Sequence, residues 1–313
     1  MSRAFIFPGQ GAQTIGMGRD LAEAYPAAKA VFDEVDAALG ENLSGLIWEG
    51  DIETLTLTAN AQPALMATSI AALRALEAEG VTVKAAAYVA GHSLGEYTAL
   101  TAAGALTVSD AARLLRKRGQ AMQAAVPVGQ GAMAAVLGLD LDGVRAVVAE
   151  AAQGDVLAAA NDNDPAQVVI SGAKAAVERA VDVAKAAGAK RALLLPVSAP
   201  FHCDLMQPAA DVMAEALDDV EIRAPKVPLV ANVRAASVTD VTLIRALLVE
   251  QVCGSVRWRE SVEYMVGKGV TEFWEIGAGK ALSGMVRRIH KDAGVRNVGT
   301  AADVKAAVEA FNA

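Results

Sequence analysis

The chain has 313 residues, of which 54% are hydrophobic and 20% are charged, and its formal net charge at pH 7 is −8. These proportions indicate a globular protein with a sizeable core and exclude a disordered chain. The negative charge argues against general binding of nucleic acid. No apolar run approaches the roughly 18 residues that a membrane-spanning helix needs, so we expect no membrane association.

The cysteine and histidine content narrows the chemistry further. Cys203 and Cys253 are the only cysteines; they are too few for a disulfide framework, which fits a reducing cytoplasm. The two cysteines and three histidines show no spacing typical of metal ligands, so we expect no metal site. Residues 1–8 are too few for the apolar segment of a signal peptide and instead predict a first strand.

Strand-like and helix-like segments alternate along the chain, which predicts an α/β fold with a mainly parallel sheet. Asn60 is expected to cap the second long helix, with Pro63 in its first turn, and Ser109 or Thr107 to cap a later one. The elements expected before residue 127 are a strand at 3–7, helices at 20–39 and 61–79, a strand at 85–91, and helices at 96–103 and 109–124.

A compact segment follows the glycine-containing stretch 127–131. Its expected elements are strands at 132–139, 156–160, 167–171 and 191–195 and helices at 141–152 and 173–187. The order β-α-β-β-α-β is that of the ferredoxin-like split motif. We therefore predict a small domain at 127–197 inserted into a large domain, residues 1–126 and 198–313. In its second half the large domain should have helices at 205–217, 240–252, 259–268 and 280–290, strands at 227–231 and 271–276, and a last strand–helix pair.

The pentapeptide Gly91-His92-Ser93-Leu94-Gly95 matches the pattern G-x-S-x-G and lies between an expected strand and an expected helix. A sharp turn in this context exposes the serine oxygen at its tip, and the glycines let strand and helix pass closely. The N–H of Leu94 then faces the position where an oxyanion forms. We interpret Ser93 as a nucleophile; the alternative is a tight structural turn.

A serine hydroxyl needs a base to take its proton, and the chain offers three histidines. His92 adjoins the serine, so its side chain should point away from it. His290 ends a helix among cations that suit the helix dipole. His202 lies in a loop with two prolines, and the chain order serine then histidine is that of elbow enzymes. We expect His202 to be the base; the alternative is a structural loop histidine.

Arg118 lies on the apolar stripe of its expected helix, which Ala111, Leu114, Leu115 and Met122 form by their spacing. A guanidinium on such a stripe needs an anion close by. That anion is either a structural carboxylate or the carboxylate of a substrate, held by two parallel hydrogen bonds. The second reading implies that the transferred acyl group carries a free acid.

Three glycine-containing stretches invite comparison with ligand-binding loops. Residues 7–13 follow the first strand; they form either a dinucleotide loop, for which Thr14 replaces the third glycine, or the second half of an oxyanion hole through the N–H of Gln10. Residues 277–281 lack the first glycine and the serine or threonine of a P-loop, which excludes that function. Residues 129–131 precede a strand and are interpreted as a linker.

Together these motifs resemble those of the malonyl-CoA:acyl-carrier-protein transacylase family. The resemblance spans essentially the whole chain in the family's order. It implies a large domain like an α/β hydrolase, carrying a ferredoxin-like insert. The stretches that carry it are Phe7–Gln13, Gly91–Tyr97, Lys117–Gly119, Pro200–Cys203, Val249–Gln251 and Glu275–Lys280.

The resemblance implies a role for each residue of the site. Ser93 would be the nucleophile and His202 its base, while Arg118 would bind the malonyl carboxylate. The N–H groups of Gln10 and Leu94 would form the oxyanion hole. No bound cofactor is implied: the substrates are malonyl-CoA and the phosphopantetheine thiol of holo acyl carrier protein.

Two further residues enter only through the resemblance. Gln251 occupies the place whose backbone carbonyl accepts the Nδ1–H of His202. Phe201 stands where many members of the family have a small residue, and similar modules of polyketide synthases carry phenylalanine there when they select malonyl units. A bulky ring beside the base would exclude an α-methyl branch.

Carrier proteins of this kind resemble one another in being acidic, whereas this chain is itself negative. Docking therefore needs a local basic patch. Lys190 and Arg191 in the small domain, with Arg287, Arg288 and Lys291 on a late helix, are the candidates; the alternative is that they are ordinary surface charges.

Other functions share part of the pattern. A serine thioesterase or esterase would have the same elbow and base, but plain hydrolysis needs neither Arg118 nor the insert. A discrete acyltransferase of polyketide synthesis would differ only in its carrier protein. A non-catalytic scaffold is disfavoured because Ser93, His202 and Arg118 are all present.

Overall fold

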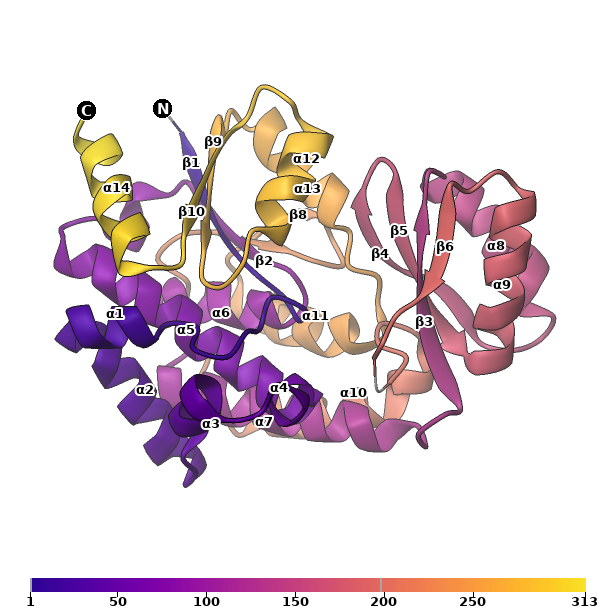
Figure 1. Cartoon of the computed structure of the whole chain (residues 1–313), viewed down its shortest axis with the longest axis horizontal. Coiled ribbons are helices and arrows are strands. Elements are labelled where there is room, and N and C mark those ends of the chain that lie inside the picture. The colour runs from indigo at the N-terminus through magenta and orange to yellow at the C-terminus, as the bar shows by residue number, and fades with distance from the viewer. Residues whose placement is uncertain (1, 198) are drawn as a thin grey trace.

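The computed structural model describes residues 2–197 and 199–313. It is an α/β structure with two sheets that lie beside one another (Figure 1). The larger sheet has the strand order β10-β9-β1-β2-β7-β8 and is parallel throughout, except for the pair β7 and β8. Its strands are β1 (Arg3–Phe7), β2 (Tyr88–Gly91), β7 (Leu229–Ala231), β8 (Ala236–Val238), β9 (Glu272–Ile276) and β10 (Gly294–Val298).

Helices cover both faces of the larger sheet, because successive side chains of a strand point to opposite sides. Ala4 and Ile6 of β1 pack with α12 (Trp258–Gly267) and α13 (Ala281–Ile289). Phe5 and Phe7 belong to the main core on the other face. The helices on that side are α1 (Arg19–Ala24), α2 (Pro26–Leu39), α3 (Leu43–Glu49), α4 (Ile52–Thr56), α5 (Thr58–Ala78), α6 (Leu94–Ala102), α7 (Val108–Ala125), α10 (Gln207–Asp218), α11 (Val241–Cys253) and α14 (Ala301–Asn312).

The smaller sheet is antiparallel, with the order β4-β5-β3-β6. It has a core of its own, centred on Val136, Val168 and Val177. Figure 1 shows its two helices on the side away from the larger sheet. The elements are β3 (Gly131–Leu137), α8 (Leu141–Ala152), β4 (Leu157–Asp164), β5 (Gln167–Ala173), α9 (Lys174–Ala186) and β6 (Arg191–Leu194), and the 3₁₀ turns elsewhere are η1 (Val83–Ala85) and η2 (Asp204–Met206).

The polar end of strand β4 joins the smaller sheet to the helices that cover one face of the larger sheet. The N–H of Asp162 donates to the carbonyl oxygen of Val256 across 2.9 Å. The carboxylate of Asp162 lies 2.8 Å from the guanidinium of Arg259 on α12, and that of Asp164 lies 2.7 Å from Arg288 on α13. Both carboxylates are almost completely buried.

The α/β class predicted from the sequence is confirmed, and several element bounds are corrected. The helix expected at 20–39 is two helices, because Pro26 starts a new one after the extended Tyr25. The next long helix begins at Thr58, so Asn60 lies inside it rather than at its cap. Pro63, which has no N–H, leaves the carbonyl of Ala59 free, and Arg116 donates to it.

Other differences are smaller. The strand expected at 85–91 begins only at Tyr88, because η1 precedes it. Thr107, not Ser109, caps α7 by accepting from the N–H of Asp110. Helices α3 and α4 and strand β8 were not predicted. Residues 1 and 198, at two bounds of the expected large domain, lie outside the described residues. No helix in the described part is both long enough and apolar enough to cross a membrane.

Candidate active site

The G-x-S-x-G pentapeptide forms a sharp turn between β2 and α6. Ser93 has φ 52° and ψ −110°, a backbone conformation that residues other than glycine adopt only under strain. A Cβ atom on Gly91 would lie 1.9 Å from the carbonyl oxygen of Gly95, and one on Gly95 would lie 2.4 Å from that of Phe7. Both positions therefore require glycine, and the turn presents the Ser93 side chain at the carboxyl end of the sheet.

His202 contacts the serine directly. Its Nε2 atom lies 2.8 Å from the Ser93 Oγ atom, and its Nδ1 atom lies 2.9 Å from the carbonyl oxygen of Gln251 and 3.1 Å from that of Gly254. Burial, with the nearby Arg118 cation, lowers the pKa of His202 to about 3. The imidazole is thus neutral, with the Nδ1–H donated to the carbonyls and the Nε2 lone pair directed at the serine.

Arg118 reaches the same serine from α7 and is 1% exposed. Its Nη2 atom donates to the Ser93 Oγ atom at 3.1 Å and to the side-chain oxygen of Gln251 at 2.7 Å, and its Nη1 atom donates to Gln62 at 2.7 Å. Its Nε–H is buried without a partner, and it forms no ion pair with any carboxylate of residues 2–197 and 199–313. A buried cation with neutral partners is well suited to bind an anionic ligand.

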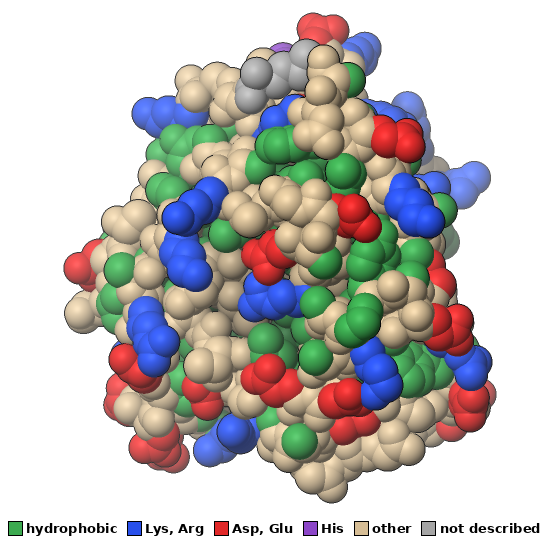
Figure 2. Space-filling view, turned by 90° about the vertical axis from the view of Figure 1, so that its left-hand side faces the viewer, with side chains coloured by type: hydrophobic (Ala, Val, Ile, Leu, Met, Phe, Trp, Pro, Cys, Tyr) green, Lys and Arg blue, Asp and Glu red, His purple; other side chains and the backbone are tan. Residues whose placement is uncertain are grey.

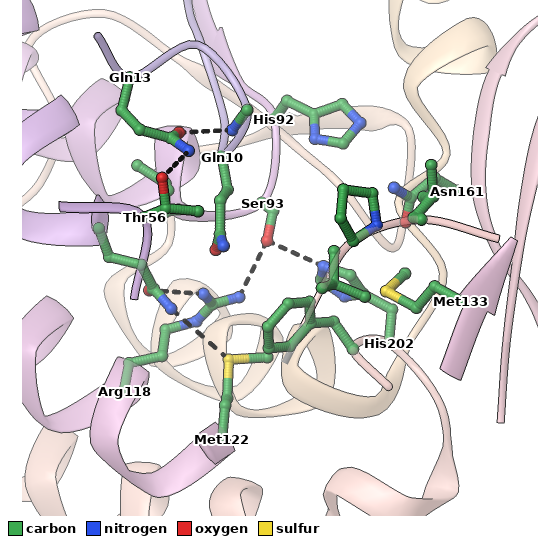
Figure 3. A pocket seen from close by; sticks show the side chains of 17 residues that line it. Gln10, Gln13, Thr56, His92, Ser93, Arg118, Met122, Met133, Asn161 and His202 are labelled. Atoms are coloured by element: carbon green, nitrogen blue, oxygen red, sulfur yellow. Dashed lines mark hydrogen bonds between the residues drawn. The ribbon is translucent and has the colours of Figure 1, made fainter. Parts of the chain in front are cut away.

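These groups open onto one cavity of about 330 Å³ (Figure 3). Gln10 and Leu94 line it as well, and Leu94 is the first residue of α6, where an N–H has no acceptor within the helix. Phe201 contributes to the apolar wall. The other lining residues are Gly11, Gln13, Thr56, Gln62, His92, Met122, Met133, Asn161, Leu195, Pro196 and Val197.

The buried side chains of Gln62 and Thr58 connect Arg118 to Gln10. Gln62 accepts from Arg118 and donates to the Thr58 hydroxyl at 3.0 Å. Thr58 in turn donates to the side-chain oxygen of Gln10 at 2.9 Å. The loop after β1 is therefore fixed relative to the guanidinium.

The other two histidines do not contact Ser93. The Nε2 atom of His92 lies 2.8 Å from the side-chain oxygen of Asn163, and Figure 3 shows the ring of His92 directed away from the serine hydroxyl. Burial lowers the pKa of His92 below its usual value. His290 lies at the C-terminal end of α13.

The structure also includes residues that the sequence analysis did not select. Glu96, Asn232 and Gln62 are each 1% exposed and contact the groups described above. Burial raises the pKa of Glu96 to about 7, although hydrogen bonds from Gln251 and Asn232 and the charge of Arg118 oppose this rise. The one available signal was the position of Glu96 directly after the G-x-S-x-G pentapeptide; Asn232 and Gln62 are distant in sequence and carry none.

The basic residues considered for docking are not part of this cavity. Lys190, Arg191 and Arg287 are exposed. Arg288 is not a free cation, because its Nε–H donates to the buried carboxylate of Asp164. On the face shown in Figure 2, cations and anions are interspersed, so this side of the molecule has no extended basic patch. Within the described residues, no group of three His, Cys, Asp or Glu side chains is placed to hold a metal.

A serine oxygen within hydrogen-bond distance of a neutral imidazole can be acylated and deacylated, which defines a class of enzymes that transfer acyl groups. Comparison with known proteins agrees. The family described as the acyl transferase domain matches residues 4–308, and the chain belongs to this family.

Individual relatives of this chain carry more specific names than the family does. The chain is 50% identical to the malonyl CoA-acyl carrier protein transacylase of Bacillus subtilis, over 92% of this chain and 90% of that protein. It is 50% identical to the Escherichia coli K12 protein of the same name, over 91% and 92%. A crystal structure of an acyl-carrier-protein-S-malonyltransferase from Bartonella henselae matches with a TM-score of 0.98 and 54% identity over 100% of both chains.

A further solved structure is described as a type II PKS acyl-carrier protein in complex with its malonyl-transacylase. It is 44% identical to this chain with a TM-score of 0.96, and the match covers 99% of this chain and 100% of that one.

Proposed function

We propose that this enzyme transfers the malonyl group of malonyl-CoA to the phosphopantetheine thiol of acyl carrier protein through a malonyl-Ser93 intermediate, supplying fatty acid synthesis. One observation carries this proposal: the buried guanidinium of Arg118 lies 3.1 Å from the Ser93 oxygen and has only neutral side-chain oxygens as acceptors. A free carboxylate on the acyl group would supply the missing anion. The names of the relatives support the same substrate pair.

In the first half-reaction, the Ser93 oxygen attacks the thioester carbonyl while its proton passes to Nε2 of His202. The N–H groups of Gln10 and Leu94 stabilise the oxyanion, each worth about 2.7–4 kcal/mol of barrier in comparable sites. Collapse of the tetrahedral intermediate, which carries the oxyanion, breaks the carbon–sulfur bond of the thioester. The coenzyme A thiol leaves with the proton that His202 returns.

In the second half-reaction, the carrier-protein thiol gives its proton to His202 and attacks the malonyl-serine carbonyl. Collapse now breaks the ester carbon–oxygen bond, and His202 returns the proton to the Ser93 oxygen. The scheme predicts ping-pong kinetics. The Gln251 carbonyl holds the imidazole with Nε2 toward the serine, and a neutral carbonyl suffices here because a thioester is cleaved more easily than an amide.

We further propose that residues 1–126 and 198–313 form an α/β hydrolase-like catalytic domain and that residues 127–197 form a ferredoxin-like small domain. The strand order β4-β5-β3-β6, with α8 and α9 in the two crossovers, supports the second assignment.

Phe201 is proposed to exclude α-branched acyl groups. It is 9% exposed and lines the cavity next to the base.

We propose that Lys190, Arg191 and Arg287 attract the acidic carrier protein, and their exposure supports this role. Arg288 is assigned a structural role instead, because it forms an ion pair with Asp164.

A discrete acyltransferase of polyketide synthesis is the second candidate, favoured by the similarity to the transacylase bound to a type II PKS carrier protein. A serine thioesterase or esterase would share the serine and histidine but has no use for Arg118.

The deciding experiment is mass spectrometry of the intact protein after brief mixing with malonyl-CoA, with Ser93→Ala as control, followed by holo acyl carrier protein. A Ser93 adduct that is stable in buffer and discharged by the carrier supports the proposal. An adduct lost to water at the same rate with and without carrier would indicate a hydrolase, and no adduct would contradict malonyl as the substrate.

A further inference from the structure

Glu96 lies behind the nucleophile elbow, where no substrate reaches it. It is in the first turn of α6, is 1% exposed, and its Oε2 atom accepts two hydrogen bonds. The side-chain amide of Gln251 donates across 2.7 Å, and the backbone N–H of Asn232 donates across 3.2 Å. One carboxylate oxygen thus joins α6 to α11 and to the end of β7.

Both partners of Glu96 hold the peptide groups of Ser93. The side-chain oxygen of Asn232 accepts from the Ser93 N–H at 2.8 Å, and its amide donates to the carbonyl of Gly91 at 2.7 Å. The side-chain amide of Gln251 also donates to the Ser93 carbonyl at 3.0 Å. The strained backbone of Ser93, with φ 52°, is therefore hydrogen-bonded at its N–H by Asn232 and at its carbonyl by Gln251, and both of these residues donate to Glu96.

The side chain of Gln251 also contacts Arg118. Its side-chain oxygen accepts from Nη2 of Arg118 at 2.7 Å, the same nitrogen that lies 3.1 Å from the Ser93 oxygen. An amide that donates both hydrogens to Glu96 and Ser93 can present only its oxygen to Arg118. The orientation of Gln251, and through it the position of the guanidinium, is thus determined by the acceptor at Glu96.

We propose that Glu96 is a positioning residue for the transfer reaction: it orients Asn232 and Gln251, which fix the Ser93 elbow and align Arg118. The expected effect of Glu96 on acyl-group selectivity rests on the proposed function, whereas its expected effect on the Ser93 elbow does not. The Glu96 oxygen accepts from both donors at once, so a side chain without an acceptor at this position would leave both buried donors unpaired.

The variants separate the acceptor oxygen from the charge. Glu96→Ala removes the anchor, whereas Glu96→Gln keeps an oxygen that can accept from both donors. Glu275 offers the matched control, since it is also fully buried and accepts from two backbone N–H groups, those of Leu282 and Ser283, away from the elbow. Glu275→Gln therefore alters a comparably buried carboxyl group without touching Ser93.

The first readout is the labelling rate of Ser93 by a fluorophosphonate, which needs no malonyl group. The second is the ratio of kcat/KM for malonyl-CoA to that for acetyl-CoA. We expect Glu96→Ala to slow labelling and to lower the ratio by about tenfold, because the buried donors of Gln251 and Asn232 both lose their acceptor. Glu96→Gln should recover much of the labelling rate with a smaller change in the ratio, and Glu275→Gln should change neither.

A double-mutant cycle with Gln251→Leu tests the route through Gln251 and remains available if Glu96→Ala does not fold. When the Gln251 side chain is absent, Glu96→Gln should no longer change the malonyl-to-acetyl ratio. Additive effects on the ratio, or unchanged labelling and ratio in a folded Glu96→Ala protein, would overturn the proposal. Normal labelling of the wild type without a malonyl adduct would instead reject the proposed function and leave the elbow role to be decided by the labelling rates.

Discussion

Arg118 donates a 2.7 Å hydrogen bond to Gln62, a neutral side chain, although its guanidinium is almost completely buried. Burying a cation without an ion-pair partner is unfavourable by several kcal/mol in typical proteins. Gln62 satisfies the geometry of one N–H but not the charge. The buried positive charge of Arg118 is thus left without an ion-pair partner in the free enzyme, and under the proposed function a substrate carboxylate would supply that partner.

Loss of this guanidinium should change which acyl group is transferred. We expect Arg118→Ala to lower kcat/KM for malonyl-CoA by roughly 100-fold, because each hydrogen bond to a charged group contributes about 1.5–3 kcal/mol. Acetyl transfer should change less or improve. Steady-state rates with both thioesters provide the measurement, and Arg113→Ala, an exposed arginine of the same helix, should change neither rate. Equal losses for malonyl and acetyl would refute a carboxylate-binding role.

Phe201 should control acceptance of an α-methyl branch. Phe201→Ser opens space beside His202, so we expect the methylmalonyl-to-malonyl ratio of kcat/KM to rise by about tenfold, the scale on which an apolar pocket discriminates one methyl group. Competition between the two thioesters measures this ratio directly. Met133→Leu, a substitution of similar volume at another wall of the cavity, should leave it unchanged, and an unaltered ratio in Phe201→Ser would exclude the role.

The sequence pattern predicted the elements that alternate apolar and polar residues over many positions. The pattern predicted α8 without error, as residues 141–152. It did not predict α3 and α4, because these helices are too short to show a period. Their capping side chains, Asn42 and Asp51, were the local signals available. The break at Pro26 was also readable, since proline disfavours a helical conformation in the residue before it.

Some residues of the site could also be predicted from the sequence, and others could not. Ser93 and Leu94 lie in one local motif, so a pentapeptide is enough to predict them. The pairing of Glu96 with Asn232 and Gln251 joins residues 136 and 155 positions apart, and only the three-dimensional arrangement of α6, β7 and α11 brings them together. The residue type of Glu96 does not reveal its burial, because exposed helices are rich in glutamate; its position directly after the pentapeptide was the one signal available.

Charge reversal should test the docking cations. We expect Arg191→Glu and Arg287→Glu to raise KM for the acyl carrier protein and to leave KM for malonyl-CoA unchanged, since an acidic partner is attracted by these charges before the thiol enters the site. Transfer rates at increasing carrier concentration and at two salt concentrations would show the effect. Arg145→Glu, at another exposed arginine, is the control. If the carrier KM is unaffected in both variants, the docking assignment is wrong.

The ion pair between Asp162 and Arg259 should stabilise the contact between the smaller sheet and helix α12. Arg259 also pairs with Glu263, whose side chain is 49% exposed, whereas that of Asp162 is 2% exposed. Asp162→Asn removes the buried charge that pairs with the partly buried guanidinium of Arg259, so we expect the free energy of unfolding to fall by about 1–3 kcal/mol. Glu263→Gln should change it by less than about 1 kcal/mol. Urea unfolding compares the two variants, and equal effects would contradict the distinction by burial.

Glu96 and His202 should affect stability in opposite directions as pH changes. The pKa of His202 in the folded protein, about 3, is below its usual 6.5, so its contribution is lost as pH falls from about 6.5 toward 3. The pKa of Glu96, about 7, is above its usual 4.5, so the folded state binds a proton that the unfolded chain does not between these values. Its contribution is present below about pH 4.5 and is lost as pH rises through 7.

Glu96→Gln isolates the second contribution. A neutral amide cannot titrate, so the stability of the variant relative to the wild type should be greatest at pH 8 and decline by about 1–3 kcal/mol at pH 5, where the wild-type carboxyl group is protonated. Urea unfolding at pH 8, 6.5 and 5 measures the difference, with Glu275→Gln as the reference variant. A difference that stays constant across these pH values would mean that Glu96 does not take up a proton in the folded enzyme, and its charge would then be held through the whole range by Gln251, Asn232 and Arg118.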